Sequence, residues 1–152
     1  GGQRKSVLEL GSGVSTLVCG YALEAIGGGN VLALEHDEKW CRATTDHVQA
    51  HRLSNVAAVI YAPLKNVVIG DETYPWYDYS RLPGGQFDML IVDGPPGRLH
   101  PRARYPALPI LFNMLAPGAV IVLDDANGPA QQAIVDYWRR EYGPFVVENP
   151  PA

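Results

Sequence analysis

A glycine turn with an acidic residue on either side is the stretch of this sequence best suited to chemistry. The run VLELGSGVST reads as an apolar strand, a turn and the start of a helix, and the turn consists of Gly11, Ser12 and Gly13. Glycine-rich turns of this kind hold nucleotides. Glu9 precedes the turn, and Glu35 ends the next apolar run, VLALE. A carboxylate at Glu35 can accept hydrogen bonds from both ribose hydroxyls of a nucleoside, so the pattern predicts a nucleotide site.

The residues beside the turn indicate which nucleotide it would hold. A dinucleotide fingerprint needs a third glycine, but Thr16 stands at that position. An anion at Glu9 would repel a pyrophosphate, whereas it suits a ligand with an ammonium group, such as the methionine end of S-adenosylmethionine. Glu9 could instead be a structural residue that caps nearby backbone amides. The residues favour S-adenosylmethionine and leave an NAD-binding oxidoreductase open as the alternative.

Three aspartates form a second candidate site. Asp93 follows the apolar run at residues 87–92, and Asp124 and Asp125 follow the run at residues 119–123. Adjacent strands lie about 4.8 Å apart, so Asp93 and Asp124 would share one crevice if these strands are neighbours. Close carboxylates repel each other, and a divalent cation such as magnesium would remove that conflict. The alternative is that these side chains cap turns and order the next loop.

A basic loop follows Asp93, with the sequence GPPGRLHPRARY, and its charged and titratable side chains are Arg98, His100, Arg102 and Arg104. Arginines here could bind an acidic group of a substrate. His100 could serve as a general base, as could Asp93 itself. The alternative for each residue is a place in a solvated loop without a role in chemistry.

The elements that must position these residues alternate between strands and helices. Strands are expected at residues 6–10, 31–35, 56–61, 87–92 and 119–123, with a sixth beginning at 145–147; helices are expected at 15–26, 37–51, 106–115 and 129–142. The strands are apolar throughout, which predicts an α/β fold with a mostly parallel, doubly wound, Rossmann-like sheet covered by helices on both faces. Ligands bind beyond the carboxyl ends of such strands, where the acidic residues lie.

One segment, residues 65–86, departs from this alternation. Its glycines, prolines and aromatic residues do not predict a crossover helix; residues 67–69 and 73–77 could instead form a hairpin around Gly70 and Asp71. The aromatic residues of the segment are Tyr74, Trp76, Tyr77 and Tyr79. They could line a substrate pocket or pack over the sheet.

Four motifs in order, VLELGSG, VLALEHD, FDMLIVDGPPG and LAPGAVIVLDDAN, resemble those of class I S-adenosylmethionine-dependent methyltransferases, over residues 7–147. The resemblance implies a single domain over residues 1–152 with a sheet of six to seven strands, one of them antiparallel near the end. It also implies cofactor contacts from the turn, a place for Glu9 near the methionine moiety and for Glu35 at the ribose. The expected cofactor site comprises Glu9, Gly11, Ser12, Gly13, Glu35, His36 and Asp93.

The aspartates are similar to those of catechol O-methyltransferase-like enzymes, which bind magnesium through an aspartate after the fourth strand and an Asp-Asn pair after the fifth. Carried over, Asp93, Asp124 and Asp125 would hold magnesium, although Asp125 stands where that family has asparagine. The resemblance implies O-methylation of a small-molecule acceptor. A methyltransferase-like domain that binds without catalysis is a further alternative.

Composition sets the remaining expectations. The chain has 152 residues, 47% of them hydrophobic, and a net charge of −4, which does not favour nucleic acid or anionic membranes as partners. No apolar run is long enough to span a bilayer. Cys19 and Cys41 lack metal-ligand spacing and are expected to be reduced thiols of a cytoplasmic protein. The sequence starts at Gly1 rather than Met, so we expect a fragment of a longer chain; a homodimer is left open.

Overall fold

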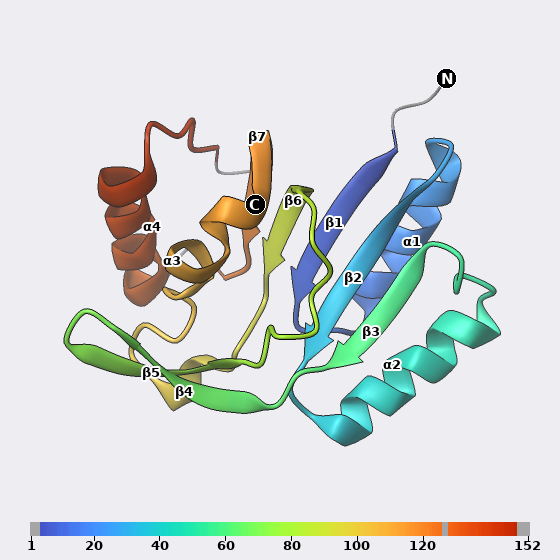
Figure 1. Ribbon diagram of the computed structural model, residues 1–152, viewed down its shortest axis with the longest axis horizontal. Helices are drawn as coiled ribbons and strands as arrows, with labels where there is room; N and C mark the ends of the chain where they lie inside the picture. The colour runs from blue at the N-terminus through green and yellow to red at the C-terminus, as the bar shows by residue number, and fades with distance from the viewer. Residues whose placement is uncertain (1–3, 126–127, 149–152) are drawn as a thin grey trace.

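The protein is described by a computed structural model that places residues 4–125 and 128–148. Its main sheet has five parallel strands in the order β3-β2-β1-β6-β7 within these residues (Figure 1). The strands are β1 (Lys5–Leu10), β2 (Gly29–Glu35), β3 (Ala57–Tyr61), β6 (Phe87–Val92) and β7 (Leu115–Leu123). The strand order reverses between β1 and β6, which is the position where ligands bind in sheets of this type.

The aromatic segment between β3 and β6 forms an antiparallel hairpin of β4 (Leu64–Ile69) and β5 (Glu72–Tyr77). Its turn has Gly70 at φ +62°, a conformation that glycine adopts at little cost. The hairpin expected from the sequence is thus confirmed, and it lies across the lower end of the sheet in Figure 1.

Helices cover both faces of the sheet. Helices α1 (Val14–Ala25) and α2 (Glu38–Ala50) lie on one side, and α3 (Ala107–Leu111) and α4 (Pro129–Tyr142) lie on the other (Figure 1). Asp37 is the N-cap of α2 and accepts a hydrogen bond from the backbone N–H of Trp40 at 2.9 Å, which fixes where the helix begins. None of the helices in the described ranges is long and apolar enough to cross a membrane.

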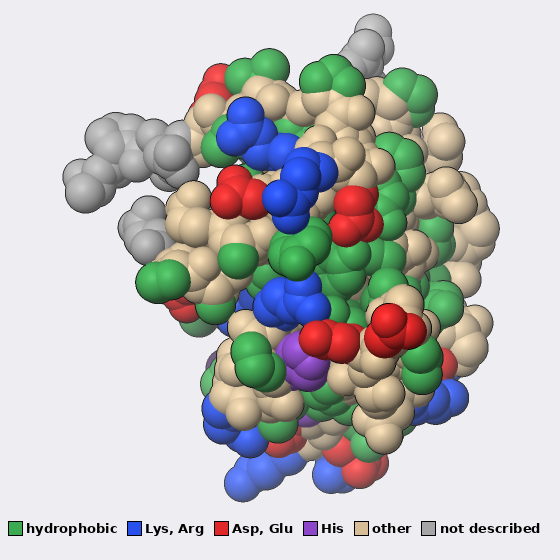
Figure 2. Space-filling model, turned by 90° about the vertical axis from the view of Figure 1, so that its left-hand side faces the viewer, with side chains coloured by type: hydrophobic (Ala, Val, Ile, Leu, Met, Phe, Trp, Pro, Cys, Tyr) green, Lys and Arg blue, Asp and Glu red, His purple; other side chains and the backbone are tan. Residues whose placement is uncertain are grey.

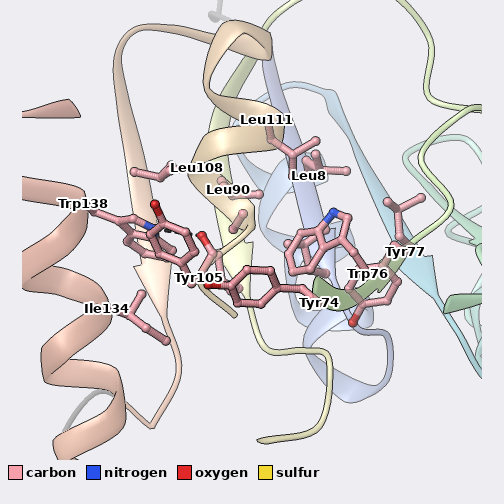
Figure 3. Packing of buried hydrophobic residues seen from close by; sticks show 14 of the residues in the cluster. Leu8, Tyr74, Trp76, Tyr77, Leu90, Tyr105, Leu108, Leu111, Ile134 and Trp138 are labelled. Carbon is pink, nitrogen blue, oxygen red and sulfur yellow. Dashed lines mark hydrogen bonds between the residues drawn. The ribbon is translucent and has the colours of Figure 1, made fainter. Parts of the chain in front are cut away.

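The alternation of side chains along the strands produces two hydrophobic clusters. Val7 of β1 packs with residues of α1 and α2, whereas its neighbour Leu8 packs with the hairpin, α3 and α4. Figure 3 shows the larger cluster, in which Trp76 of β5 lies among Leu8, Leu111 and Tyr74. The hairpin therefore supplies the packing that a crossover helix would give in a regular doubly wound sheet.

Three expectations about the strands need correction. Residues 145–147 are not in a strand; Phe145 packs against the larger cluster while Val146 is 90% exposed, and three apolar residues are too short a run to specify a strand. Strand β7 begins at Leu115 rather than at Ala119, with a register shift against β6 between Phe87 and Met89. The parallel sheet thus has five strands over the described residues, not six to seven, and no antiparallel strand joins it there.

Replacing Trp76 with alanine tests whether the hairpin is part of the core. The side chain is fully buried, so Trp76→Ala should lower the free energy of unfolding by about 3–5 kcal/mol. The matched control is Val68→Ala on β4, a side chain 71% exposed, which should change it by less than about 0.5 kcal/mol. Urea denaturation followed by circular dichroism measures both; equal small effects would contradict the packing described above.

Candidate functional site

A cavity of about 760 Å³ opens at the carboxyl ends of β1, β2 and β6. This volume lies in the range of clefts that hold cofactors and small molecules. The residues that line it are Gly11, Ser12, Glu35, His36, Asp37, Lys39, Trp40, Ala43, Tyr77, Asp93, Gly94, Pro96, Arg98 and Arg104. Five of the seven expected cofactor residues are among them; Glu9 and Gly13 are not.

The carboxylate of Glu35 joins the glycine turn to the end of β2. The backbone N–H and the hydroxyl of Ser12 both donate hydrogen bonds to Oε1, at 3.1 and 2.7 Å. The backbone N–H of Asp37 donates to Oε2 at 3.1 Å. Glu35 is 4% exposed, and Oε2 keeps capacity to accept from a ligand in the cavity. This is the arrangement that a ribose-binding carboxylate requires.

Trp40 closes the outer side of the turn, and sequence reasoning did not assign it to the site. Its indole N–H donates to the backbone carbonyl of Ser12 at 2.8 Å, although the side chain is 53% exposed. The signal that could have identified it is its position three residues after the N-cap Asp37, which places its backbone N–H on the cap and its ring near the neighbouring turn.

Glu9 is fully buried beneath the turn rather than in the cavity wall. The hydroxyls of Ser15 and Thr16 donate to its two carboxylate oxygens, and the Thr16 hydroxyl also accepts from the backbone N–H of Gly13 at 3.2 Å. Burial raises the pKa of Glu9, an effect that the two hydroxyls partly offset. This position favours the structural alternative, and the contact between Glu9 and a methionine moiety stays a prediction. The network also explains Thr16 at the third fingerprint position.

Asp93 and Asp124 do come together beyond β6 and β7, and the guanidinium of Arg104 lies beside them. Arg104 is 8% exposed; its Nη1 donates to the backbone carbonyl of Asp124 at 3.1 Å, and its Nη2 lies 3.7 Å from Oδ1 of Asp93. Burial, a hydrogen bond with the Asp124 side chain and repulsion from it raise the pKa of Asp93 to about 6. The guanidinium opposes this rise because it favours the charged carboxylate.

This geometry does not support the expected magnesium site. Among the residues that the structure describes, no three His, Cys, Asp or Glu side chains are arranged to hold a metal ion. The positive charge that would relieve repulsion between Asp93 and Asp124 comes instead from Arg104. The sequence placed Arg104 in the basic loop. Arg104 follows Asp93 by eleven residues, and nothing in this spacing indicates that the loop folds back onto the ends of β6 and β7.

His100 and Arg102 lie outside the cavity and attach the basic loop to the hairpin. The backbone N–H of Arg102 donates to Nδ1 of His100 at 2.9 Å, and the His100 ring stacks against Tyr74 with centroids 4.4 Å apart. Arg102 pairs with Glu72 of β5 at 2.9 Å. Figure 2 shows acidic and basic side chains with a histidine between them on this face. The structure therefore does not bring His100 to the site as a base, and only Arg98 and Arg104 of the loop arginines line it.

The aromatic residues of the hairpin segment were expected either to line a pocket or to pack over the sheet, and the structure shows both. Tyr77 lines the cavity, where its ring lies edge-on to His36 with centroids 6.3 Å apart. Tyr74 and Trp76 pack in the core, and Tyr79 is 42% exposed outside the cavity. The hairpin thus contributes one side chain to the cavity and otherwise covers the sheet.

Comparisons with known proteins agree with this arrangement. The family described as "Methyltransferase domain" matches residues 8–126. Ribosomal protein L11 methyltransferase of Syntrophotalea carbinolica is 26% identical over 130 residues, which are 86% of this chain and 35% of that protein. The chain therefore spans about a third of the length of this curated relative.

Two solved structures show the same fold. An S-adenosylhomocysteine-bound methyltransferase of Podospora anserina superposes with a TM-score of 0.59 at 18% identity, over 79% of this chain and 45% of that one. Precorrin-6Y C5,15-methyltransferase of Geobacter metallireducens gives 0.61 at 16% identity, over 90% and 63%. At these identities the likeness concerns the fold alone.

Replacing Arg104 tests its role as the cation of the aspartate cluster. Arg104→Met removes the donor to two backbone carbonyls, those of Pro95 and Asp124, and should lower the free energy of unfolding by about 2 kcal/mol or more. The exposed cavity residue Arg98 is the control, since Arg98→Met should change it by less than about 0.5 kcal/mol.

The loss should also depend on pH. The pKa of Asp93 is about 6 in the folded state, above its ordinary value of 3.8. Between these two pH values the folded protein holds a proton that the unfolded chain has released. The free energy of unfolding therefore falls as the pH rises from 3.8 to about 6. Without Arg104 the pKa should rise further, so the difference between Arg104→Met and the wild type should grow between pH 5 and 8. Thermal unfolding across this range measures it; a pH-independent difference would contradict the role.

Proposed function

The chain belongs to the methyltransferase-domain family and is an S-adenosylmethionine-dependent methyltransferase domain, and from this premise we propose that it methylates an oxygen of a small, anionic acceptor without a metal ion. The observation that carries the proposal is Asp93, a carboxylate in the cavity wall next to the glycine turn, whose pKa is raised to about 6. General bases work best with a pKa near the operating pH, so Asp93 suits the role better than an ordinary carboxylate.

The residues of the cavity fit the cofactor. S-adenosylmethionine, when bound, supplies an electrophilic methyl group on a positively charged sulfur. Glu35 would accept from the ribose hydroxyls through its free capacity, and Gly11 lets the turn approach the ligand closely. A Cβ at Gly11 would lie 3.1 Å from the backbone carbonyl of Asp93, so glycine also keeps β1 and β6 together at this point. The NAD alternative loses its support, because the family is one of methyltransferases.

The remaining residues would act on the acceptor. A neutral hydroxyl is a weak nucleophile, and Asp93 in its ionised form can take its proton, while the Arg104 guanidinium lies 3.7 Å from Oδ1. Alignment of the acceptor supplies most of the rest of the rate enhancement in a direct displacement. Arg98 lines the same side of the cavity and is exposed, so it can pair with an anionic group of the acceptor.

The names of similar proteins point to two other classes of methyl acceptor. The curated relative is named for ribosomal protein L11, and the solved structure from Geobacter metallireducens for positions C5 and C15 of precorrin-6Y. The net charge of −4 and a cavity of about 760 Å³ support a small molecule over a nucleic acid. A small-molecule partner, a cytoplasmic location and the open question of a homodimer stay predictions of the sequence.

Binding of the demethylated cofactor tests the cofactor site. Calorimetric titration with S-adenosylhomocysteine should show binding, and Glu35→Ala should weaken it by about tenfold to a hundredfold because the ribose loses a charged acceptor. The control is Glu38→Ala, an exposed carboxylate on the first turn of α2, outside the cavity, which should bind as the wild type does. Tighter binding of NAD than of S-adenosylhomocysteine would contradict the proposal.

The pH profile of methyl transfer tests the base. Radiolabelled S-adenosylmethionine should label members of a panel of phenols and hydroxy acids, with a rate that falls about tenfold per pH unit below 6, where Asp93 is protonated. Asp93→Asn should lose this limb and most of the rate while it keeps affinity for S-adenosylhomocysteine.

Two further arms separate the alternatives. A chelator such as EDTA should leave the rate unchanged; loss of activity that magnesium restores would reinstate the metal. Labelling only of a ribosomal protein fraction or of RNA would overturn the small-molecule acceptor. Binding of S-adenosylhomocysteine with no labelling of any of these pools would instead indicate a binding domain without catalysis.

A further inference from the structure

We propose that the hydroxyl of Tyr77, supplied by the hairpin, donates a hydrogen bond to the bound methyl donor and is a cofactor-binding residue of this chain. The inference rests on the proposed function, because it concerns the same cavity. It deepens that function by adding a contact from β5, which lies outside the main sheet and outside all four sequence motifs of the family resemblance.

The Tyr77 hydroxyl is a donor whose only opening is toward the cavity. The residue is 1% exposed, and none of the described residues forms a hydrogen bond with its hydroxyl. If this hydroxyl were completely enclosed by protein, it would be a buried polar atom without a partner. Over the described residues, however, the only such side-chain atom is Nε1 of Trp76. The Tyr77 hydroxyl is therefore in contact with the cavity that its ring lines. Buried hydroxyls are nearly always paired, so this one is paired when the cavity holds a ligand.

The charged groups around Tyr77 indicate which part of the cavity its hydroxyl faces. The groups that act on the hydroxyl are the carboxylates Glu35, Asp93 and Glu9 and the guanidinium Arg104. Glu35 is the residue for the ribose and Asp93 the residue beside the acceptor, so Tyr77 stands between the nucleoside and the reacting centre. Burial and these carboxylates raise the pKa of Tyr77, so its hydroxyl stays protonated and acts as a donor at neutral pH.

Gly94 leaves the space that this hydroxyl occupies. A Cβ at Gly94 would lie 2.0 Å from the Tyr77 oxygen and 3.3 Å from the ring carbon that carries it. Any side chain at position 94 must therefore displace the hydroxyl, whereas a phenylalanine at position 77 would leave room for a methyl group with a small adjustment. The two positions are coupled through one oxygen atom, which makes the proposal testable by a double-mutant cycle.

The test compares binding of S-adenosylhomocysteine to the wild type, Tyr77→Phe, Gly94→Ala and the double variant. Tyr77→Phe should weaken binding by about fivefold to tenfold, the loss expected for one hydrogen bond, with little change in melting temperature. Gly94→Ala should weaken it at least as much in the wild type and by less than about twofold in the Tyr77→Phe background. With a labelled acceptor, Tyr77→Phe should raise KM for the methyl donor and leave KM for the acceptor unchanged.

Tyr74→Phe is the matched control, since Tyr74 is equally buried on β5 and its hydroxyl is bonded to Glu72 instead of facing the cavity. It should bind S-adenosylhomocysteine as the wild type does. Wild-type affinity in Tyr77→Phe, or losses in the cycle that simply add, would overturn the role of Tyr77 alone. A wild-type protein that binds no S-adenosylhomocysteine would overturn the proposed function and this inference together.

Discussion

The hydrogen bonds between Glu35 and Ser12 are the constraint on which the shape of the cavity depends. They fix the glycine turn, which begins α1, to the end of β2, which leads into α2, so that two loops from neighbouring strands move as one unit. The indole of Trp40 closes the same unit from the outside through the Ser12 carbonyl. Beneath it, the buried carboxylate of Glu9 orders the first turn of α1 through two hydroxyls. One acidic residue therefore faces the cavity and the other supports the loop, although both flank the same turn.

The opposite wall of the cavity depends on charge rather than on backbone geometry. Asp93 and Asp124 lie close enough to repel each other, and Arg104 offsets that repulsion from a buried position. A guanidinium differs from a metal ion here because it is part of the chain, so a chelator cannot remove it, and it cannot coordinate an acceptor oxygen. It can hold one oxygen of a carboxylate and leave the other available. Asp93 therefore lies in the cavity wall with a pKa of about 6, which burial and Asp124 raise and Arg104 partly restrains.

The parts of the fold that follow from local pattern were predictable from the sequence, and the parts that depend on distant contacts were not. The Glu35 position, the turn and the hairpin follow from strand ends, glycine spacing and aromatic clustering. The attachment of His100 to Tyr74 and of Arg102 to Glu72 depends on the hairpin lying against the basic loop, which no local pattern encodes. The expected pairing of neighbouring strands does bring Asp93 and Asp124 together, yet it could not show that Arg104 would lie beside them. The expected strand at 145–147 was wrong because three apolar residues also suit a packed loop.

Along the chain, most of the hairpin lies between the two stretches of residues that line the cavity. Residues 11–43 supply the wall around the glycine turn, and residues 77–104 supply the wall around Asp93, so the two halves are separate stretches of chain. The far end of the hairpin, at Gly70 and Asp71, is exposed and is not part of the cavity lining. Insertions at that tip can therefore lengthen β4 and β5 without replacing any residue of either wall. The hairpin tip is therefore a place where the chain can take up added length while both walls of the cavity keep their residues and their geometry.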